Sequence, residues 1–272
     1  MKRNWDARIR RATELSSTYP FAAEGLRFYA QTAMLQQKLY SEVASTPDRF
    51  VAGNGSSWGE LHAEALLPGF SNFLANVAQT APANLAEAAA RLADSPTPGV
   101  RLLTEFWHAP ESNADRDENH QALLNDRYLA WLFLQPVAEY VAENRVRSPA
   151  DGTPRRCPQC GSKPIVGVLR PEGDGAGKSL ICMFCAHEWA FRRIYCPGCG
   201  EEREPQIALY TAAEIPHVRV DVCDTCHTYL KTIDLTKSGL AIPIVDELAS
   251  LPLDLWARQN GYQKLQINLA GI

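Results

Sequence analysis

The sequence has no apolar run that could cross a membrane, because the longest, residues 128–134, is far shorter than the ~20 residues of a helical span. It has no large excess of one charge either: 27 Lys and Arg stand against 31 Asp and Glu, a net charge of −4. The first residues, MKRNWD, lack the apolar stretch of a secretory signal. These absences predict a soluble cytoplasmic protein and argue against the basic surface of most nucleic-acid-binding domains.

Cysteine is absent from the first 156 residues and from everything after residue 226. A CxxC turn places two thiolates on one side of a tight loop, and two such turns facing each other form a cage of four sulfurs around one metal ion. Disulfides or a redox dithiol are the alternative, but nothing directs the chain to an oxidising compartment. We therefore predict two metal sites whose ligands are the eight cysteines of four CxxC pairs: Cys157, Cys160, Cys182, Cys185, Cys196, Cys199, Cys223 and Cys226.

An internal repeat predicts which turns face each other. Residues 157–161 and 196–200 share the pattern CPxCG, in which proline restricts φ and glycine accepts a positive φ. The chain reads CPxCG, gap, CxxC twice, with a shift of about 40 residues between the copies. Each copy holds four cysteines, which assigns residues 157–185 to one site and residues 196–226 to the other. An interleaved cross-brace is the alternative arrangement.

Apolar runs typical of strands accompany the cysteine turns, at residues 165–169, 207–210, 218–222 and 229–233. Two strands with a CxxC turn at each base are typical of a rubredoxin-like or zinc-ribbon unit. Zinc and iron both accept four thiolates, so the spacing leaves the metal open. Four sulfurs leave no open coordination position, which disfavours Lewis-acid catalysis.

The chain before the cysteines has the spacing of helices, at residues 23–44, 72–79, 83–93 and 121–134. The last of these is apolar almost all round, which predicts a buried helix that Pro136 kinks or ends. In residues 23–44 the expected apolar face consists of Leu26, Tyr29, Ala30, Ala33 and Met34.

We predict an α+β protein with four parts. Residues 1–147 form an α-helical bundle domain, and residues 143–154 contain the linker that follows it. Residues 155–193 and 194–238 form two tandem rubredoxin-like metal-binding units. Residues 239–272 form a C-terminal tail with a short helix from Pro252 to about residue 259.

Several other patterns have simpler explanations than a catalytic site. Residues 173–179 resemble a phosphate loop, but Glu172 stands where the first glycine should be and a cysteine turn follows, so we expect a hairpin tip. His62 is expected on a helix surface, and His187 and His227 outside cages that are already complete. Trp189 and Tyr229 are expected to pack over the ribbons. No nucleophile–base pair is visible, so we predict that the protein is not an enzyme.

Residues 156–231 resemble the FdhE family of formate dehydrogenase accessory proteins. The resemblance is carried by CPQCG at 157–161, ICMFC at 181–185 with EW at 188–189, RIYCPGCG at 193–200, and above all CDTCHTYLK at 223–231. It implies a cytoplasmic maturation factor that acts on the catalytic subunit of a respiratory formate dehydrogenase before export. The family is described as rubredoxin-like and linked to iron, which favours iron over zinc in both four-cysteine sites. A rubredoxin-type electron carrier, a nucleic-acid-binding zinc ribbon and a homodimer remain open.

Overall fold

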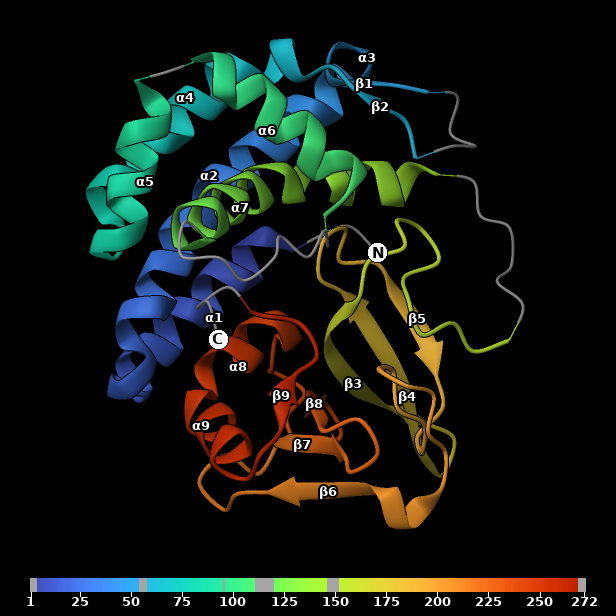
Figure 1. The fold of residues 1–272 in the computed structure, drawn as a ribbon. Coiled ribbons are helices and arrows are strands. Elements are labelled where there is room, and N and C mark those ends of the chain that lie inside the picture. The colour runs from blue at the N-terminus through green and yellow to red at the C-terminus, as the bar shows by residue number, and fades with distance from the viewer. Residues whose placement is uncertain (1–3, 54–57, 95, 111–119, 146–151, 269–272) are drawn as a thin grey trace. The chain divides into compact units, whose positions relative to one another are not determined.

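A computed structural model describes residues 4–53, 58–94, 96–110, 120–145 and 152–268 (Figure 1). Contacts divide the chain into two compact units. We call Met1–Ala30 together with Ser148–Ile272 the sheet unit, and Gln31–Arg147 the helical unit. The first thirty residues thus group with the cysteine-bearing part, whereas the sequence places them in the helical domain. The predicted boundaries at 147, 155, 193 and 238 stay predictions. Residue 147 lies outside the described part of the chain.

In the residues that the structure describes, the helical unit contains the later part of α2 and five further helices. Phe133 is buried in this unit, with its ring 5.0 Å from that of Phe70 and 5.6 Å from that of Phe73. The helices expected at 23–44, 72–79 and 83–93 are confirmed. The elements are α2 (Ala23–Ser45), α3 (Pro47–Phe50), α4 (Ala63–Thr80), α5 (Ala83–Ala93), α6 (Pro96–His108) and α7 (His120–Asn144), with the short antiparallel strands β1 (Val51–Ala52) and β2 (Glu60–Leu61).

Helix α7 differs from its prediction because it passes through Pro136 and continues to Asn144. Proline has no N–H to donate to the carbonyl of Leu132, four residues earlier. The side chain of Gln36 supplies the missing donor, with Nε2 2.6 Å from that carbonyl oxygen. A side chain from another helix therefore supplies the hydrogen bond that the proline cannot make.

The helices also expose some apolar residues that the sequence places in the core. In α7, Leu129 is fully buried, but Leu123 and Leu124 are 45% and 38% exposed. The sequence predicts a buried helix here, and that prediction is wrong for the first turns of α7. In α2 the predicted apolar face is buried except for Met34, which is 51% exposed because it lies at the margin of that face.

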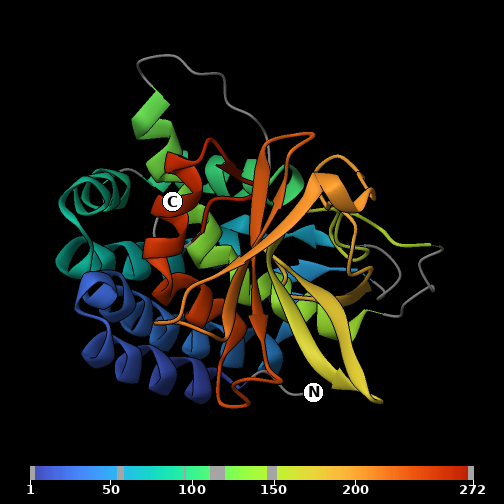
Figure 2. The same ribbon diagram turned by 90° about the horizontal axis from the view of Figure 1, so that it is seen from below.

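The sheet unit contains one continuous sheet in the order β5-β4-β3-β8-β7-β6, with β9 paired to β8. Strands β3 to β5 belong to the first cysteine repeat and β6 to β8 to the second. They join where β3 and β8 run parallel (Figure 2). In this pairing Gly167 lies opposite Thr232. The strands are β3 (Pro164–Glu172), β4 (Gly175–Cys182), β5 (Glu188–Phe191), β6 (Ile207–Thr211), β7 (Val218–Cys223), β8 (Thr228–Asp234) and β9 (Gln263–Lys264). The two predicted ribbons are thus confirmed, and they are fused edge to edge.

The sheet unit also contains helices from both ends of the chain: α1 (Trp5–Thr18), α8 (Pro243–Ala249) and α9 (Leu251–Gln259). Helix α8 contacts α1, β3 and β8. The C-terminal tail therefore contains two helices where the sequence predicts one. Helix α8 was missed because its residues 244–249 are all buried, including Asp246 and Glu247, so no polar face marks it.

A buried group of charges fixes β8, the strand after the last CxxC pair, against α8 and α9. Lys231 Nζ lies 2.6 Å from Asp254 Oδ2, and Lys264 Nζ lies 2.7 Å from Asp254 Oδ1. Both lysines also pair with Glu247. Tyr229 donates its hydroxyl to Asp254 Oδ1 at 2.8 Å. Two cations balance two carboxylates, which makes their complete burial tolerable.

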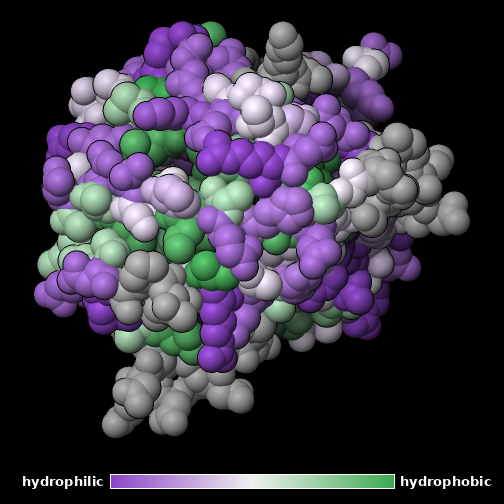
Figure 3. All heavy atoms as spheres, turned by 90° about the horizontal axis from the view of Figure 1, so that it is seen from above, coloured by the Kyte–Doolittle hydropathy of each residue, from purple (hydrophilic) through white to green (hydrophobic). Residues whose placement is uncertain are grey.

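Some large apolar side chains are exposed on the surface of the protein. On the face that Figure 3 shows, hydrophobic residues lie in small groups between hydrophilic ones. Among the large apolar residues that the structure describes, Leu240 is the most exposed, at 84%, followed by Leu255 at 54%. Such scattered exposure is ordinary for folded proteins and marks no site by itself. No helix of the described part is both long enough and apolar enough to cross a membrane.

Candidate metal centres

The sulfur atoms lie in the two groups that the repeat predicts. Within each group all four Sγ atoms lie within 4.8 Å of one another: Cys157, Cys160, Cys182 and Cys185 in the first, Cys196, Cys199, Cys223 and Cys226 in the second. The cross-brace is not the arrangement found. Cross-turn Sγ–Sγ distances are 3.5 and 3.3 Å in the first group and 3.7 Å twice in the second. These are far longer than the ~2.0 Å of a disulfide bond, so the eight cysteines, all of them in the described part of the chain, form no disulfide.

The sulfur positions fit a tetrahedral metal ion. A metal–sulfur distance of ~2.3 Å corresponds to an edge of ~3.8 Å between sulfurs, close to the distances above. Backbone N–H groups also point at the sulfurs, as a thiolate requires. The N–H groups of Gln159, Phe184 and Gly198 lie 3.4, 3.3 and 3.3 Å from the Sγ atoms of the cysteines two residues before them. Ligation of a metal by these eight residues stays a prediction.

The CPxCG turns have the conformation expected from their glycines. Gly161 has φ 78° and Gly200 has φ 86°, and each donates its N–H to the carbonyl of the first cysteine of its turn, at 2.9 Å. The other two turns reach a positive φ without glycine, at Ala186 (φ 48°) and His227 (φ 53°). Each of these residues directly follows the second cysteine of its pair. In all four turns the residue after the second cysteine thus has a positive φ, although only two of the turns have the glycine that favours it.

Burial makes a bare thiolate costly in the first group. It raises the pKa of Cys182 and of Cys185 above the ordinary thiol value, because a charged sulfur is poorly solvated there. A cation held between the sulfurs would offset that cost. The donor set and its surroundings therefore fit a metal ion.

The histidines near the cysteine turns lie outside both groups, as the complete cages suggest. His187 is 5% exposed, stacks on Trp189 with ring centres 6.3 Å apart, and accepts the N–H of Cys182 on its carbonyl at 2.9 Å. His227 is exposed, with its ring 6.5 Å from that of Tyr262. Trp189 and Tyr229, 7% and 1% exposed, are packed as predicted.

Two further candidates from the sequence lie outside both cysteine groups. Of the hairpin tip predicted at residues 173–179, residues 173 and 174 form the turn between β3 and β4, while residues 175–179 belong to strand β4. His62 precedes helix α4 and does not lie on a helix surface; its Nδ1 is 3.2 Å from the carbonyl oxygen of Arg49.

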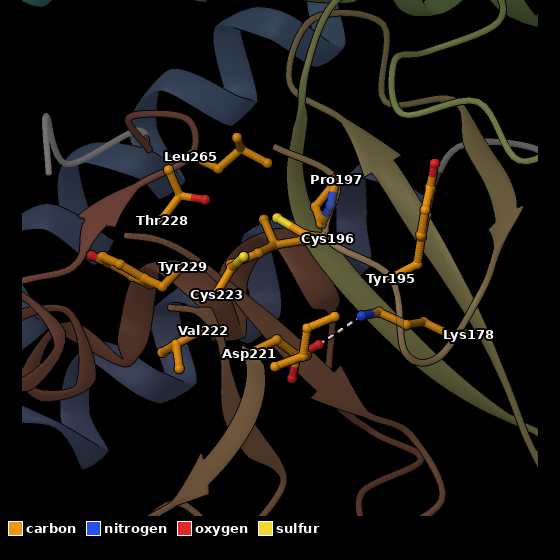
Figure 4. Close-up of a pocket in the computed structure, with 12 residues that line it drawn as sticks. Lys178, Tyr195, Cys196, Pro197, Asp221, Val222, Cys223, Thr228, Tyr229 and Leu265 are labelled. Atoms are coloured by element: carbon orange, nitrogen blue, oxygen red, sulfur yellow. Dashed lines mark hydrogen bonds and ion pairs between the residues drawn. The ribbon is translucent and has the colours of Figure 1, made fainter. Parts of the chain in front are cut away.

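A buried ion pair beside the second group was not predicted. Lys178 on β4 and Asp221 on β7 pair at 2.7 Å across the joint between the ribbons (Figure 4). Arg219 contacts the same carboxylate at 2.8 Å, and Thr232 donates its hydroxyl to it at 2.9 Å. Charged residues on strands are usually solvent-facing, so the sequence carries no signal for this pair. It lines a cavity of about 20 Å³, whose lining includes Cys196, Cys223 and Thr228.

Comparison with known proteins identifies the cysteine-bearing part of the chain. Residues 156–193 match the family description "FdhE, central domain", and residues 194–270 match "FdhE, C-terminal domain". The FdhE homolog of Aquifex aeolicus is 32% identical over 146 residues, which are 53% of this chain and 52% of that protein. The FdhE homolog of Haemophilus ducreyi is 31% identical over 181 residues, 62% of this chain and 59% of that protein. The matches thus span about half to three-fifths of these relatives.

A solved structure has a similar fold. The crystal structure of the FdhE protein from Pseudomonas aeruginosa superimposes with a TM-score of 0.66, over 97% of this chain and 94% of that chain. The sequence identity in this superposition is 23%, so the likeness concerns the fold.

Proposed function

Because the chain belongs to the FdhE family through residues 156–270, we propose that it is an accessory protein for the maturation of a formate dehydrogenase. It would bind the catalytic subunit of that enzyme in the cytoplasm and would not itself catalyse a reaction. The two four-cysteine groups on a single continuous sheet are the observation that carries this proposal. Closed thiolate sites suit a rigid scaffold, because the energy of metal binding becomes folding energy.

We propose that the eight cysteines hold two metal ions, with iron favoured over zinc. Four thiolates suit either metal, and the preference for iron comes from the resemblance to a rubredoxin-like family. Elemental analysis of protein purified without oxygen tests this choice. Two iron ions per chain with the visible absorption of ferric thiolate support it, whereas two zinc ions per chain refute the preference while leaving the sites intact.

Capture of the client tests the accessory role. Purified full-length protein on a resin should retain the formate dehydrogenase catalytic subunit from a lysate, identified by mass spectrometry. A variant with Cys157→Ser and Cys160→Ser should retain less of it, because the first ribbon loses its metal. The variant Asp48→Asn, at an exposed residue of the helical unit, is the matched control and should retain the wild-type amount. No enrichment over an unrelated zinc-ribbon protein would refute the proposal.

Electron transfer is the second candidate, favoured by the exposure of Cys199 in the second group. An electron reaches an iron–thiolate site most readily through an exposed sulfur. Reversible bleaching of the ferric colour by a reductant, followed by reoxidation by a partner, would support it. Colourless protein that contains only zinc would exclude it.

A further inference from the structure

The two cysteine groups differ in how far the surrounding chain covers them. Three cysteines of the first group are buried and one is half-buried. In the second group only two are buried, because Cys226 is half-buried and Cys199 is exposed. The repeat in the sequence therefore does not make the two sites equivalent.

A further difference in cover lies in the second CxxC turn of each repeat. In the first repeat the residues between and after the cysteines are apolar, and their burial seals the turn against water. In the second repeat the residues at the same positions are polar and face solvent. The apolar residues are Met183, Phe184 and Ala186, at most 3% exposed, and their exposed counterparts are Asp224, Thr225 and His227.

Further contacts close the first group and leave the second open. The stacked rings of His187 and Trp189 are buried beside the first group, and the indole N–H of Trp189 donates to the carbonyl of Pro154 at 2.9 Å. That bond ties β5 to the segment that leads into the first cysteine turn. In the second group, the hydroxyl of Thr228 lies 3.1 Å from Cys226 Sγ, and a cavity of about 20 Å³ reaches Cys196. The second group therefore has solvent on one side and a water-sized space on another.

We propose that the second group is an exchange site, at which a thiolate of a partner polypeptide enters the coordination sphere of the metal ion, while the ion in the first group stays enclosed. The proposal rests on metal binding by both groups. It gives the two repeats different tasks: the first stabilises the fold, and the second presents a metal ion to another protein.

The exchange needs only ligand substitution. An incoming thiol would give its proton to solvent, and its thiolate would take the place of Cys199 as a ligand. Cys199 would leave as a thiolate and take up a proton from solvent, so the number of sulfur ligands would stay at four. The ion keeps its oxidation state throughout. Meanwhile the two buried cysteines of the group, Cys196 and Cys223, hold the ion in place.

Zinc release from the full-length protein tests the proposal. Protein loaded with two zinc ions is mixed with the chromophoric chelator 4-(2-pyridylazo)resorcinol, and released zinc is followed by absorbance. We expect two phases of one ion each, with rates that differ by about tenfold or more, since the shell around a site controls access to it. Added glutathione should accelerate the fast phase in proportion to its concentration and leave the slow phase unchanged.

Matched variants assign the phases. Cys199 and Cys160 are the second cysteines of the two CPxCG turns, so Cys199→Ser should change only the fast phase and Cys160→Ser only the slow phase. Limited alkylation of the zinc-loaded wild type by iodoacetamide needs no substitution, and mass spectrometry should find Cys199 modified first. Release of both ions in one phase, or modification of Cys160 before Cys199, would overturn the proposal. Protein that binds no zinc at all would instead overturn the metal sites themselves.

Discussion

At the scale of single residues, Gly167 controls how closely the two ribbons approach. A Cβ atom on Gly167 would lie 2.3 Å from Thr232 Oγ1 and 3.2 Å from its Cβ. Thr232 cannot move aside easily, because it is fully buried and its hydroxyl is bonded to Asp221. The parallel pairing of β3 with β8 therefore requires glycine at this position.

We predict that Gly167→Ala destabilises the sheet unit by about 1–3 kcal/mol, the usual cost of overpacking a buried site. Urea unfolding followed by circular dichroism measures it. Gly239→Ala is the control, because a Cβ there has nothing within 4 Å, and it should change stability by less than about 0.5 kcal/mol. In a Thr232→Ala background the cost of Gly167→Ala should shrink. Equal stability of the two glycine-to-alanine variants would contradict the prediction.

At the scale of elements, one carboxylate joins helix α1 to the far end of the chain. Arg11 on α1 donates to both oxygens of Asp246 on α8, at 3.0 and 2.6 Å. His217, which precedes β7, lies 2.9 Å from Asp246 Oδ1, and the N–H of Ile242 donates to Oδ2 at 2.7 Å. Burial alone would raise the pKa of Asp246, but the hydrogen bonds from His217 and Arg11 outweigh it and lower the pKa overall.

We predict that Asp246→Asn destabilises the sheet unit by about 2–3 kcal/mol at pH 7, because Arg11 loses its buried partner. The lowered pKa means that the carboxylate stabilises the fold above the unfolded value of about 3.9, and that this contribution disappears as the pH falls through the folded value. The difference between variant and wild type should therefore shrink below about pH 4.

Urea unfolding at several pH values measures this dependence. Asp48→Asn, at an exposed carboxylate in the helical unit, serves as the control and should leave stability nearly unchanged at every pH. A difference between Asp246→Asn and wild type that stays constant as the pH falls well below the unfolded value of about 3.9 would show that the charge of Asp246 is not what matters.

At the scale of the whole molecule, the two units depend on different sources of stability. The helical unit has an aromatic core around Phe133 and contains no cysteine. The sheet unit contains all eight cysteines. It also includes the first thirty residues of the chain, among them helix α1. Loss of metal should therefore act on a set of residues that is discontinuous in the sequence.

We predict that removal of the metal by a chelator loosens residues 152–268 and helix α1 together, while residues 31–145 keep their protection. The reason is that α1 is held by contacts with α8, which in turn packs on β3 and β8. Hydrogen–deuterium exchange with peptide resolution measures it, and restored protection after metal is added back is the control. Unchanged protection of α1 while the sheet loosens would contradict the grouping of residues 1–30 with the sheet.

Local patterns in the sequence determined the cysteine groups, the paired strands and most helices. A CxxC turn, an alternating strand or an amphipathic helix depends on residues a few positions apart, so its spacing is visible without the fold. The exceptions show the limit of such patterns. Where helix α7 passes through Pro136, the carbonyl of Leu132 is satisfied by Gln36, which lies far away in the sequence. Helix α8 is buried on every side, so it has no period to detect.

Only the tertiary structure decided how these elements combine. The parallel joint between β3 and β8, the ion pair of Lys178 with Asp221, and the bond from Arg11 to Asp246 all connect residues far apart in the chain. It also decided that the two repeats differ, because Cys160 is half-buried while its counterpart Cys199 faces solvent. The exposure of a residue depends on which parts of the folded chain pack against it. The spacing of residues along the sequence does not show this.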